Sequence, residues 1–372
     1  MTSSLVRIDL ATLAKNIEQI RAQLPRGLKV LFAVKSDGYG HGIEAVARTA
    51  EEAGIEYLGV ATVEEGADIR HAGVKLPALL LGPILPSEAR VALELDLTLQ
   101  VSDLEFAQFL SHLAKELGKK VHVQVNVDTG MRRFGVSSDN AVLFLTKLRT
   151  LPALDIVGIF SHLAVADSEL PEDQSYTLKQ IEHFETVLAK LDHADILPPL
   201  RHIGNSAGLI QYRDQVTSQP MNMVRIGTLF YGYLEVRRPW AEGVNPVGTL
   251  TTRVIALKEL APGDYVGYGR TYKASCHQRV AILSIGYGSG LSPHLSNCGH
   301  VWLKGRYAPV IGKLCLDHTT IDVTDIDGVS VGDAVEVFGL HLPADHLAEM
   351  VGLPVSEILV PALRGAGNRV YQ

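Results

Sequence analysis

Two patterns of apolar and polar residues alternate along the N-terminal part of the chain. Short apolar runs such as KVLFAVK (29–35) predict buried strands, and between these runs apolar residues recur at helical spacing. Leu13, Ile17 and Ile20, for example, share one helical face ahead of the first run. The predicted strands cover residues 29–35, 57–62, 77–82, 97–102, 120–128, 155–163, 200–206 and 222–227.

Eight buried strands joined by helical crossovers indicate a parallel sheet, and eight is the number that closes a (β/α)8 TIM-type barrel. A doubly wound open sheet is the alternative. That fold carries a GxGxxG fingerprint after its first strand, whereas this chain reads KSDGYGHG at residues 35–42. The barrel is therefore the favoured prediction, over residues 10–234.

After residue 234 the pattern changes. Alternating β-branched runs separated by PG, DG and GD turns predict strands, and the helical signal is weak until PADHLAEMVG (343–352). The chain is thus predicted to be an α/β protein in which the barrel is followed by a C-terminal all-β domain over residues 235–372.

The composition narrows the class of protein. A formal net charge of -7 over 372 residues argues against a nucleic-acid binder, which would carry a basic excess. The cysteines (Cys276, Cys298 and Cys315) form no CxxC pair, so neither a zinc site nor a disulfide framework is expected. The first residues lack the apolar core of a signal peptide, and no segment is apolar for long enough to span a bilayer. A cytoplasmic protein without a metal site is the resulting expectation.

In a barrel of this kind, chemistry collects at the C-terminal ends of the strands. A single amine, Lys35, follows the first strand, and Asp128 is the clear carboxylate at this mouth. The later strands deliver cationic, hydroxyl and amide groups, namely Arg133, Ser161, His162, Asn205, Ser206, Arg225, Gly227 and Thr228.

Ser206 and the Gly227–Thr228 pair follow the last two strands, where barrels of this class bind phosphate. An amine opposite a phosphate site suggests a phosphorylated carbonyl compound that Lys35 holds covalently, and pyridoxal phosphate is the obvious candidate. The alternative is that these side chains are ordinary strand-end groups that face water.

The segment AVKSDGYGHG (33–42) resembles the cofactor-lysine segment of the alanine racemases, which are fold-type III pyridoxal phosphate enzymes. The similarity covers nearly the whole chain in the family's order, through VRIDLATLAKNIEQI, NVDTGMRRFG, IFSHLAVAD, RHIGNSAG, NMVRIGTLFYG, VGYGRTY, IGYGSG and IGKLCLDHTTIDV. The resemblance implies a head-to-tail homodimer that acts on a small amino acid. It also implies that residues 1–9 join the second domain.

The resemblance further implies a two-base reaction. Lys35 binds the cofactor and acts as the base on one face of the substrate Cα, and Tyr268 of the partner subunit acts on the opposite face. A chain of hydrogen bonds runs from Tyr268 through His162 to Arg225, which faces the pyridine nitrogen of the cofactor. Because an arginine keeps its protons, that nitrogen stays unprotonated and withdraws electrons less strongly, which disfavours side reactions.

Other positions take cofactor-binding and substrate-binding roles by the same resemblance. The phosphate is bound by Tyr39, Ser206, Gly227 and Thr228, with Asn205 beside them. Arg133 contacts the phenolic oxygen of the cofactor and the substrate carboxylate, and Tyr287 closes the entrance.

Three positions depart from the family pattern. Asn126 replaces a lysine, often carbamylated, that steadies the arginine, so we expect a bound anion such as chloride near Asn126 and Arg133. Leu316 replaces a methionine whose backbone meets the substrate carboxylate. Ser356 replaces a tyrosine that encloses the alanine methyl group, which predicts a larger, more polar pocket that also accepts serine.

Two other functions compete with a racemase of alanine and serine. A decarboxylase of the same fold is disfavoured by Arg225, because such enzymes carry an acidic residue at that position. A cofactor-binding protein without turnover is disfavoured by Tyr268, which lies at the right point of a complete second domain.

Overall fold

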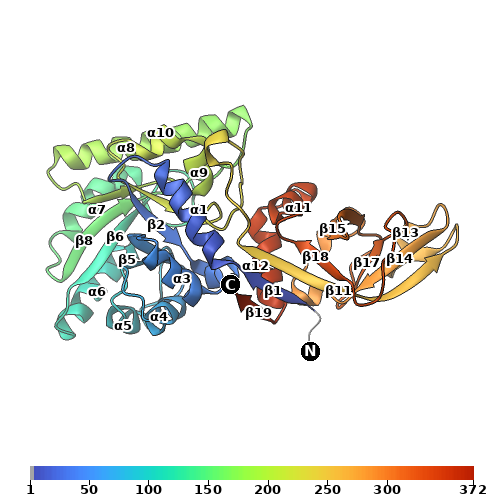
Figure 1. Cartoon of the computed structure of the whole chain (residues 1–372). Coiled ribbons are helices and arrows are strands. Elements are labelled where there is room, and N and C mark those ends of the chain that lie inside the picture. Colours follow the sequence, from blue (N-terminus) through green and yellow to red (C-terminus); the bar gives the residue numbers. More distant parts are fainter. Residues whose placement is uncertain (1–3) are drawn as a thin grey trace.

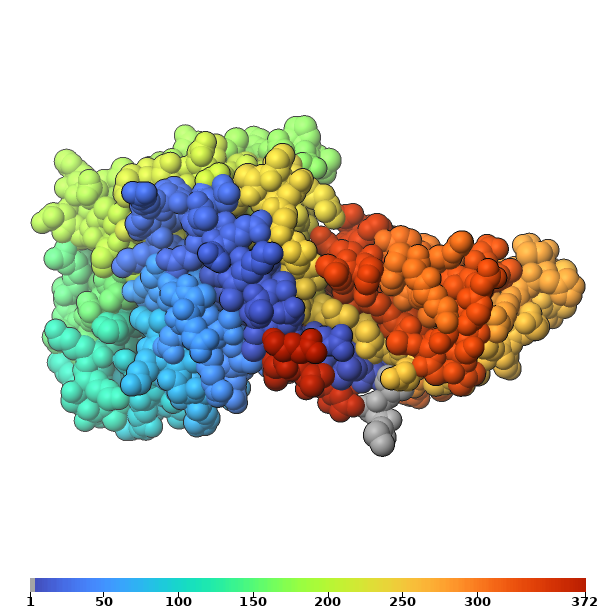
Figure 2. Space-filling view, viewed as in Figure 1, coloured from blue at the N-terminus to red at the C-terminus, as the bar shows by residue number. Residues whose placement is uncertain are grey.

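The structure is a computed structural model that describes residues 4–372 of the chain. A barrel and a smaller domain lie end to end, as Figure 1 shows. In the space-filling view of Figure 2, the red C-terminal residues lie against the dark blue N-terminal segment, between the two bodies.

All of the barrel strands predicted from the sequence are confirmed, most of them with shorter ends. They are β2 (Lys29–Ala33), β3 (Tyr57–Val60), β4 (Ala78–Leu80), β5 (Leu99–Val101), β6 (Val121–Asp128), β8 (Leu154–Phe160), β9 (Leu200–His202) and β10 (Met223–Ile226). A two-residue strand, β7 (Val136–Ser137), pairs with the end of β6.

The strands close into a barrel through two parallel arcs, in the orders β10-β2-β3-β4 and β5-β6-β8-β9. Backbone hydrogen bonds join the arcs at both seams. Leu80 N donates to Thr98 O at one seam, and Arg225 N donates to Gly204 O at the other. The (β/α)8 prediction is therefore confirmed, and the C-terminal ends of all the barrel strands face one mouth.

Helices on the outside of the barrel present apolar side chains to the strands. The helices are α1 (Leu10–Ala22), α3 (Ile43–Glu52), α4 (Val63–His71), α5 (Ala89–Glu94), α6 (Leu104–Glu116), α7 (Ala141–Leu148), α8 (Pro171–His193), α9 (Ser206–Gln211) and α10 (Arg213–Thr217). The short segment α2 (Lys35–Tyr39) lies at the mouth and has left-handed φ values. On α1 the predicted apolar face is buried through Leu13, Ile17 and Ile20.

The second domain is built on an eight-stranded sheet. Its strands are β1 (Leu5–Ile8), β11 (Gly248–Leu260), β14 (Gln278–Leu283), β15 (His300–Leu303), β16 (Arg306–Pro309), β17 (Thr319–Asp322), β18 (Ala334–Phe338) and β19 (Arg369–Tyr371). A separate hairpin joins β12 (Tyr265–Val266) to β13 (Tyr272–Lys273). Strand β1 pairs with β11 and β19, so residues 5–8 of the N-terminal segment lie in this domain. Residues 1–3 of the predicted segment lie outside the described part.

The domain boundaries, 10–234 and 235–372 with 1–9, remain our proposal. Residues 235–246 connect β10 to β11, and within them Val236 and Ala241 are buried. The proposed boundary after residue 234 therefore falls at the start of a connection that packs against the domains. A flexible linker would instead be exposed to solvent.

Two helices follow the strands of the second domain. The predicted α11 (Ala344–Val351) is confirmed, whereas α12 (Val355–Gly365) was missed, because prolines at 354 and 361 interrupt its sequence pattern. Helix α12 packs on the segment that follows β2. A Cβ atom added to Gly40 would lie 2.8 Å from the Cβ atom of Leu363.

Candidate active site

The mouth of the barrel contains a cavity of about 200 Å³. The residues around it come from the ends of several strands and from the connections that follow them. They are Ala33, Lys35, Tyr39, Leu81, His162, Asn205, Ser206, Arg225, Gly227, Thr228 and Glu235. The structure thus brings together all of the predicted cofactor-binding residues except Arg133, which lies outside this lining.

Lys35 is positioned by a left-handed turn that follows β2. Ser36, Asp37, Gly38 and Tyr39 have φ between 51 and 61°. Asp37 stabilises the turn, because its carboxylate accepts from Ile43 N at 2.9 Å and from Arg369 Nη2 at 2.6 Å. His41 Nδ1 donates to Gly38 O at 2.9 Å. The turn carries Lys35 and Tyr39 into the same cavity.

The Lys35 amine lies in a cationic, mostly buried environment. Burial lowers its pKa, and the nearby charges of Arg133 and Arg225 lower it further. Glu65 and Glu235 oppose this effect. An amine with a lowered pKa is more often neutral near pH 7, which is the form that acts as a nucleophile or as a base.

Arg225 lies buried at the end of β10 and organises the two histidines beside it. Its guanidinium donates to His202 Nδ1 at 2.8 Å, to His162 Nδ1 at 3.0 Å and to Ser161 O at 2.9 Å. Burial and the charge of Arg133 lower the pKa of Arg225 to about 9, which still leaves it a cation at neutral pH. Because a guanidinium has donors only, each histidine must accept at Nδ1 and carry its proton on Nε2.

Both histidines are held in the neutral form. Burial, followed by the charge of Arg225, lowers the pKa of His162 and of His202 well below the usual value. His202 Nε2 donates to Gln124 Oε1 at 2.7 Å. The chain of hydrogen bonds therefore runs from Gln124 through His202 and Arg225 to His162, whose Nε2–H is left for a further partner.

Neither Gln124 nor His202 is among the site residues predicted from the sequence. Both are fully buried polar residues on strands, in the runs VHVQVNVD and LRH. A buried amide and imidazole need hydrogen-bond partners. The sequence signal was therefore a polar residue at an inward-facing position of each of two predicted strands. Such residues could have been predicted to pair with each other.

The other side of the cavity offers hydroxyl donors. Ser206 Oγ accepts from Gly227 N at 2.8 Å, which leaves its O–H free to donate to a ligand. Burial raises the pKa of Tyr39, so its phenol remains a neutral donor, and its oxygen would lie 3.2 Å from a Cβ atom on Gly227. Asn205 begins α9, and its side chain accepts from Gly208 N at 2.8 Å. A buried amine, a guanidinium and these hydroxyl groups fit a small phosphorylated aldehyde such as pyridoxal phosphate.

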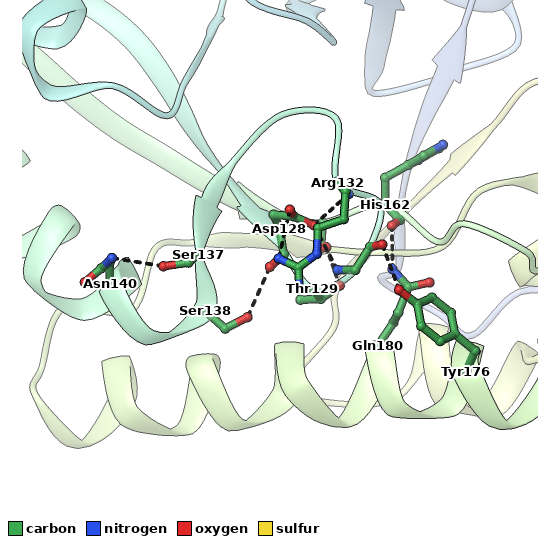
Figure 3. Close-up of polar contacts among 11 residues, drawn as sticks. Asp128, Thr129, Arg132, Ser137, Ser138, Asn140, His162, Tyr176 and Gln180 are labelled. Carbon is green, nitrogen blue, oxygen red and sulfur yellow. Dashed lines mark hydrogen bonds and ion pairs between the residues drawn. The ribbon is translucent and has the colours of Figure 1, made fainter.

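Helix α8 holds two of the loops at the mouth (Figure 3). Gln180 donates to His162 O at 3.1 Å and accepts from Ala164 N at 2.9 Å. Tyr176 donates to Gly130 O at 2.8 Å, in the loop that leads to Arg133. The buried amide of Gln180 therefore fixes the backbone that presents His162.

In the same loop, Asp128 acts on the backbone rather than on a ligand. Its carboxylate accepts from Gly130 N at 2.8 Å and from Arg132 N at 3.1 Å. Arg132 has a φ of 56° where the family pattern has glycine, and its side chain pairs with Asp128 at 3.4 Å. The Asp128 bonds thus stabilise a left-handed residue next to Arg133.

The predicted residues of the second domain lie outside the cavity of their own chain. Tyr268 is in a short turn between β12 and β13 and is 70% exposed. Figure 1 shows β13 at the end of the second domain that is remote from the barrel. Tyr287 and Leu316 are also exposed and lie together, since Tyr287 N and Gly288 N donate to the carbonyls of residues 315 and 316. Ser356 is half-buried in the first turn of α12.

The fold and the cavity define a two-domain barrel protein with a single reactive amine, and comparisons with known proteins identify its family. Residues 8–235 match the family described as alanine racemase, N-terminal domain, and residues 247–371 match alanine racemase, C-terminal domain. The chain belongs to the alanine racemase family. Enzymes of this family are isomerases that use pyridoxal 5'-phosphate and are typically dimers.

Individual alanine racemases are similar to this chain over most or all of its length. An alanine racemase of Halothermothrix orenii is 40% identical over 336 residues, which is 89% of this chain and 86% of the relative. The structure of alanine racemase from Clostridium difficile 630 has a TM-score of 0.89 at 30% identity and covers 100% of this chain and 96% of its own. A complex of that protein with cycloserine has a TM-score of 0.86 at 29% identity, with the same coverage. Among residues 4–372 the structure contains no helix that is both long and apolar enough to cross a membrane.

The role of Gln180 can be tested by replacing it with methionine, which fills similar space. We expect Gln180→Met to lower the free energy of unfolding by about 1–2 kcal/mol, because two partly buried backbone groups lose their partner. Urea denaturation followed by circular dichroism would measure the change. Gln174→Met, at a half-buried position of the same helix, serves as the control and should have little effect. Equal stabilities for the two variants would show that Gln180 does not hold these loops.

Proposed function

We propose that this protein is a pyridoxal phosphate-dependent racemase that interconverts the enantiomers of alanine and also accepts serine. The observation that carries the proposal is the joint presence, in one cavity, of an amine with a lowered pKa, Lys35, and a cation without a carboxylate partner at this site, Arg225. We propose a cytoplasmic location as well, which the three free cysteines support.

Racemisation needs one base on each face of the substrate Cα. Bound pyridoxal phosphate would withdraw electrons from that carbon, which acidifies its proton. We assign the base on one face to Lys35 and the base on the other to Tyr268 of the partner subunit. Lys35 would also hold the cofactor, Tyr39, Ser206, Gly227 and Thr228 would bind its phosphate, and Arg133 would contact the substrate carboxylate.

The surroundings of Lys35 support its assignment, because they favour the neutral amine that can accept a proton. A tyrosine has an ordinary pKa near 10 and needs help to act as a base. His162 can give that help, since its Nδ1 is bound to Arg225 and its Nε2–H is free to donate to a phenolate. The exposure of Tyr268 at the far end of the second domain supports a role in a second copy of the chain.

The shared site can be tested by mixing two inactive variants. Lys35→Ala and Tyr268→Phe should each abolish most racemase activity. When they are unfolded together in equal amounts and refolded, half of the dimers are mixed, and each mixed dimer holds one complete site. We therefore expect about one quarter of wild-type activity in a coupled assay for D-alanine.

A control for this experiment mixes Lys35→Ala with Lys35→Met, which should stay inactive at every ratio. Retention of bound cofactor by Tyr268→Phe, seen by absorbance, would show that its cavity is intact. If the mixture of Lys35→Ala and Tyr268→Phe also stays inactive, the two residues do not belong to one shared site.

We propose a bound anion, such as chloride, next to Asn126 and Arg133. Asn126 is a buried neutral residue at the end of β6, whereas the charge of Arg133 acts on Lys35, His162 and Arg225 alike. An anion would offset part of this positive charge and steady the arginine.

Chloride should therefore increase kcat/KM in a saturable way, by about fivefold, as expected for roughly 1 kcal/mol from a partly exposed charge pair. The measurement replaces gluconate by chloride at constant ionic strength. Asn126→Asp supplies a fixed charge and should remove the dependence on chloride. An unchanged rate in wild-type protein over the full titration would contradict the proposal.

Ser356 should widen the substrate range, because a hydroxymethyl group stands where the family pattern has a tyrosine. We expect Ser356→Tyr to lower the ratio of serine to alanine kcat/KM by about tenfold, the usual effect of a pocket that loses room for one small group. Assays on single enantiomers of both amino acids measure the ratio. Glu357→Gln, the exposed neighbour, is the matched control. If wild-type protein racemises alanine but turns over no serine, the broader substrate range is wrong.

A further inference from the structure

Glu235 is a titratable residue of the cavity that the reaction described above does not use. Its side chain lines the mouth cavity together with Ser206, Gly227 and Thr228, the residues assigned to the phosphate. It also lines a second cavity of about 410 Å³, whose wall includes Asp345 and Glu349 of α11. Its carboxyl group therefore lies between the site of the cofactor and an acidic cavity at the domain junction.

The groups that face Glu235 favour its protonated form. Burial, followed by the negative charge of Asp167, raises the pKa of Glu235 to about 7. A hydrogen bond with Thr228 and the charge of Lys35 act in the opposite direction. The carboxyl also lies close enough to Tyr39 to raise the pKa of that phenol.

The arginine beside the second cavity, Arg237, already pairs with other carboxylates. Arg237 pairs with Asp345 and with Glu349, each at 3.4 Å. Lys35 is then the cation whose charge favours the ionised form of Glu235. In the proposed function the Lys35 amine would be bound to the cofactor, so this charge would not be free to stabilise the carboxylate. A phosphate dianion bound beside an ionised Glu235 would then place like charges together in a buried space, which is unfavourable.

We propose that Glu235 is a further ligand of the cofactor phosphate and acts as a neutral carboxylic acid whose O–H donates to a phosphate oxygen. The proposal rests on the proposed function, because it requires the cavity to bind a phosphorylated cofactor. A protonated carboxyl is a donor, as are the Tyr39 and Ser206 hydroxyls in the same cavity. When Glu235 is ionised in the free protein, it takes one proton from solvent as the phosphate enters.

The test is the pH dependence of cofactor binding to the full-length protein after its own cofactor has been removed. Dissociation constants for pyridoxal 5'-phosphate are measured by absorbance between pH 6 and 9. At pH 6, Glu235→Gln should bind about as tightly as wild type, since its amide also donates. Above pH 7, wild type should lose affinity relative to Glu235→Gln by about tenfold for each pH unit.

Three controls isolate the carboxyl–phosphate contact. With pyridoxal, which lacks the phosphate, the dissociation constants of wild type and Glu235→Gln should change with pH in parallel. This comparison removes any pH effect that acts through Lys35. Glu349→Gln removes a charge from the far side of the second cavity and should follow wild type. Glu235→Ala loses the donor and should bind more weakly than wild type at pH 6, which keeps the test valid if Glu235→Gln fails to fold.

Parallel pH profiles of wild type and Glu235→Gln with pyridoxal 5'-phosphate would overturn the role of Glu235 and leave the racemase proposal intact. The same follows if the profiles diverge equally with pyridoxal. Failure of wild type to bind pyridoxal 5'-phosphate at any pH would overturn both.

Discussion

The position of Lys35 depends on a left-handed turn that L-amino acids adopt at a cost. Ser36, Asp37 and Tyr39 each have a positive φ, and such a conformation costs roughly 1–2 kcal/mol per residue. Local backbone hydrogen bonds and contacts from distant parts of the chain together offset this cost. Asp37 pairs with Arg369 of the C-terminal strand, and Leu363 of α12 packs against Gly40. The second domain thus helps to hold Lys35 of its own barrel in place.

A second constraint is the permanent charge of Arg225. Because the guanidinium donates to both histidines, it fixes their tautomers and keeps them neutral. Gln124 ends this chain of hydrogen bonds with a group that does not titrate near neutral pH. Burial and the charge of Arg133 lower the pKa of Lys35, and the charge of Arg225 adds to this effect, so the same arginine orders the network and favours the neutral amine.

The local sequence pattern was enough to predict the barrel and most of its mouth. Buried parallel strands appear as continuous apolar runs, and the position of a residue at a strand end places it at the mouth. Lys35, His162, Ser206 and Arg225 were found in this way. Their assigned roles came from the resemblance to a family, not from the strand pattern.

What the pattern missed depends on contacts between distant segments. The turn from Ser36 to Tyr39 is contacted by Arg369 and by α12, which lie far from residue 36 in the sequence. Gln124 and His202 are polar residues in apolar strands, and their pairing is visible only when β6 and β9 are placed in one barrel. Glu235 follows the last barrel strand at the predicted domain boundary, and its position in the fold, rather than a sequence pattern, makes it a part of the cavity.

The second domain would have two separate roles in the proposed dimer. Its inner side, with α12 and β19, stabilises the turn that carries Lys35 in the same chain. Its outer end exposes Tyr268, together with the hairpin of β12 and β13, away from that barrel. One chain can therefore complete the cavity around Lys35, while the second base that we propose, Tyr268, would come from a partner. Because both roles fall on the second domain, we expect the placement of Lys35 in one site and of Tyr268 in the other to depend on the same domain.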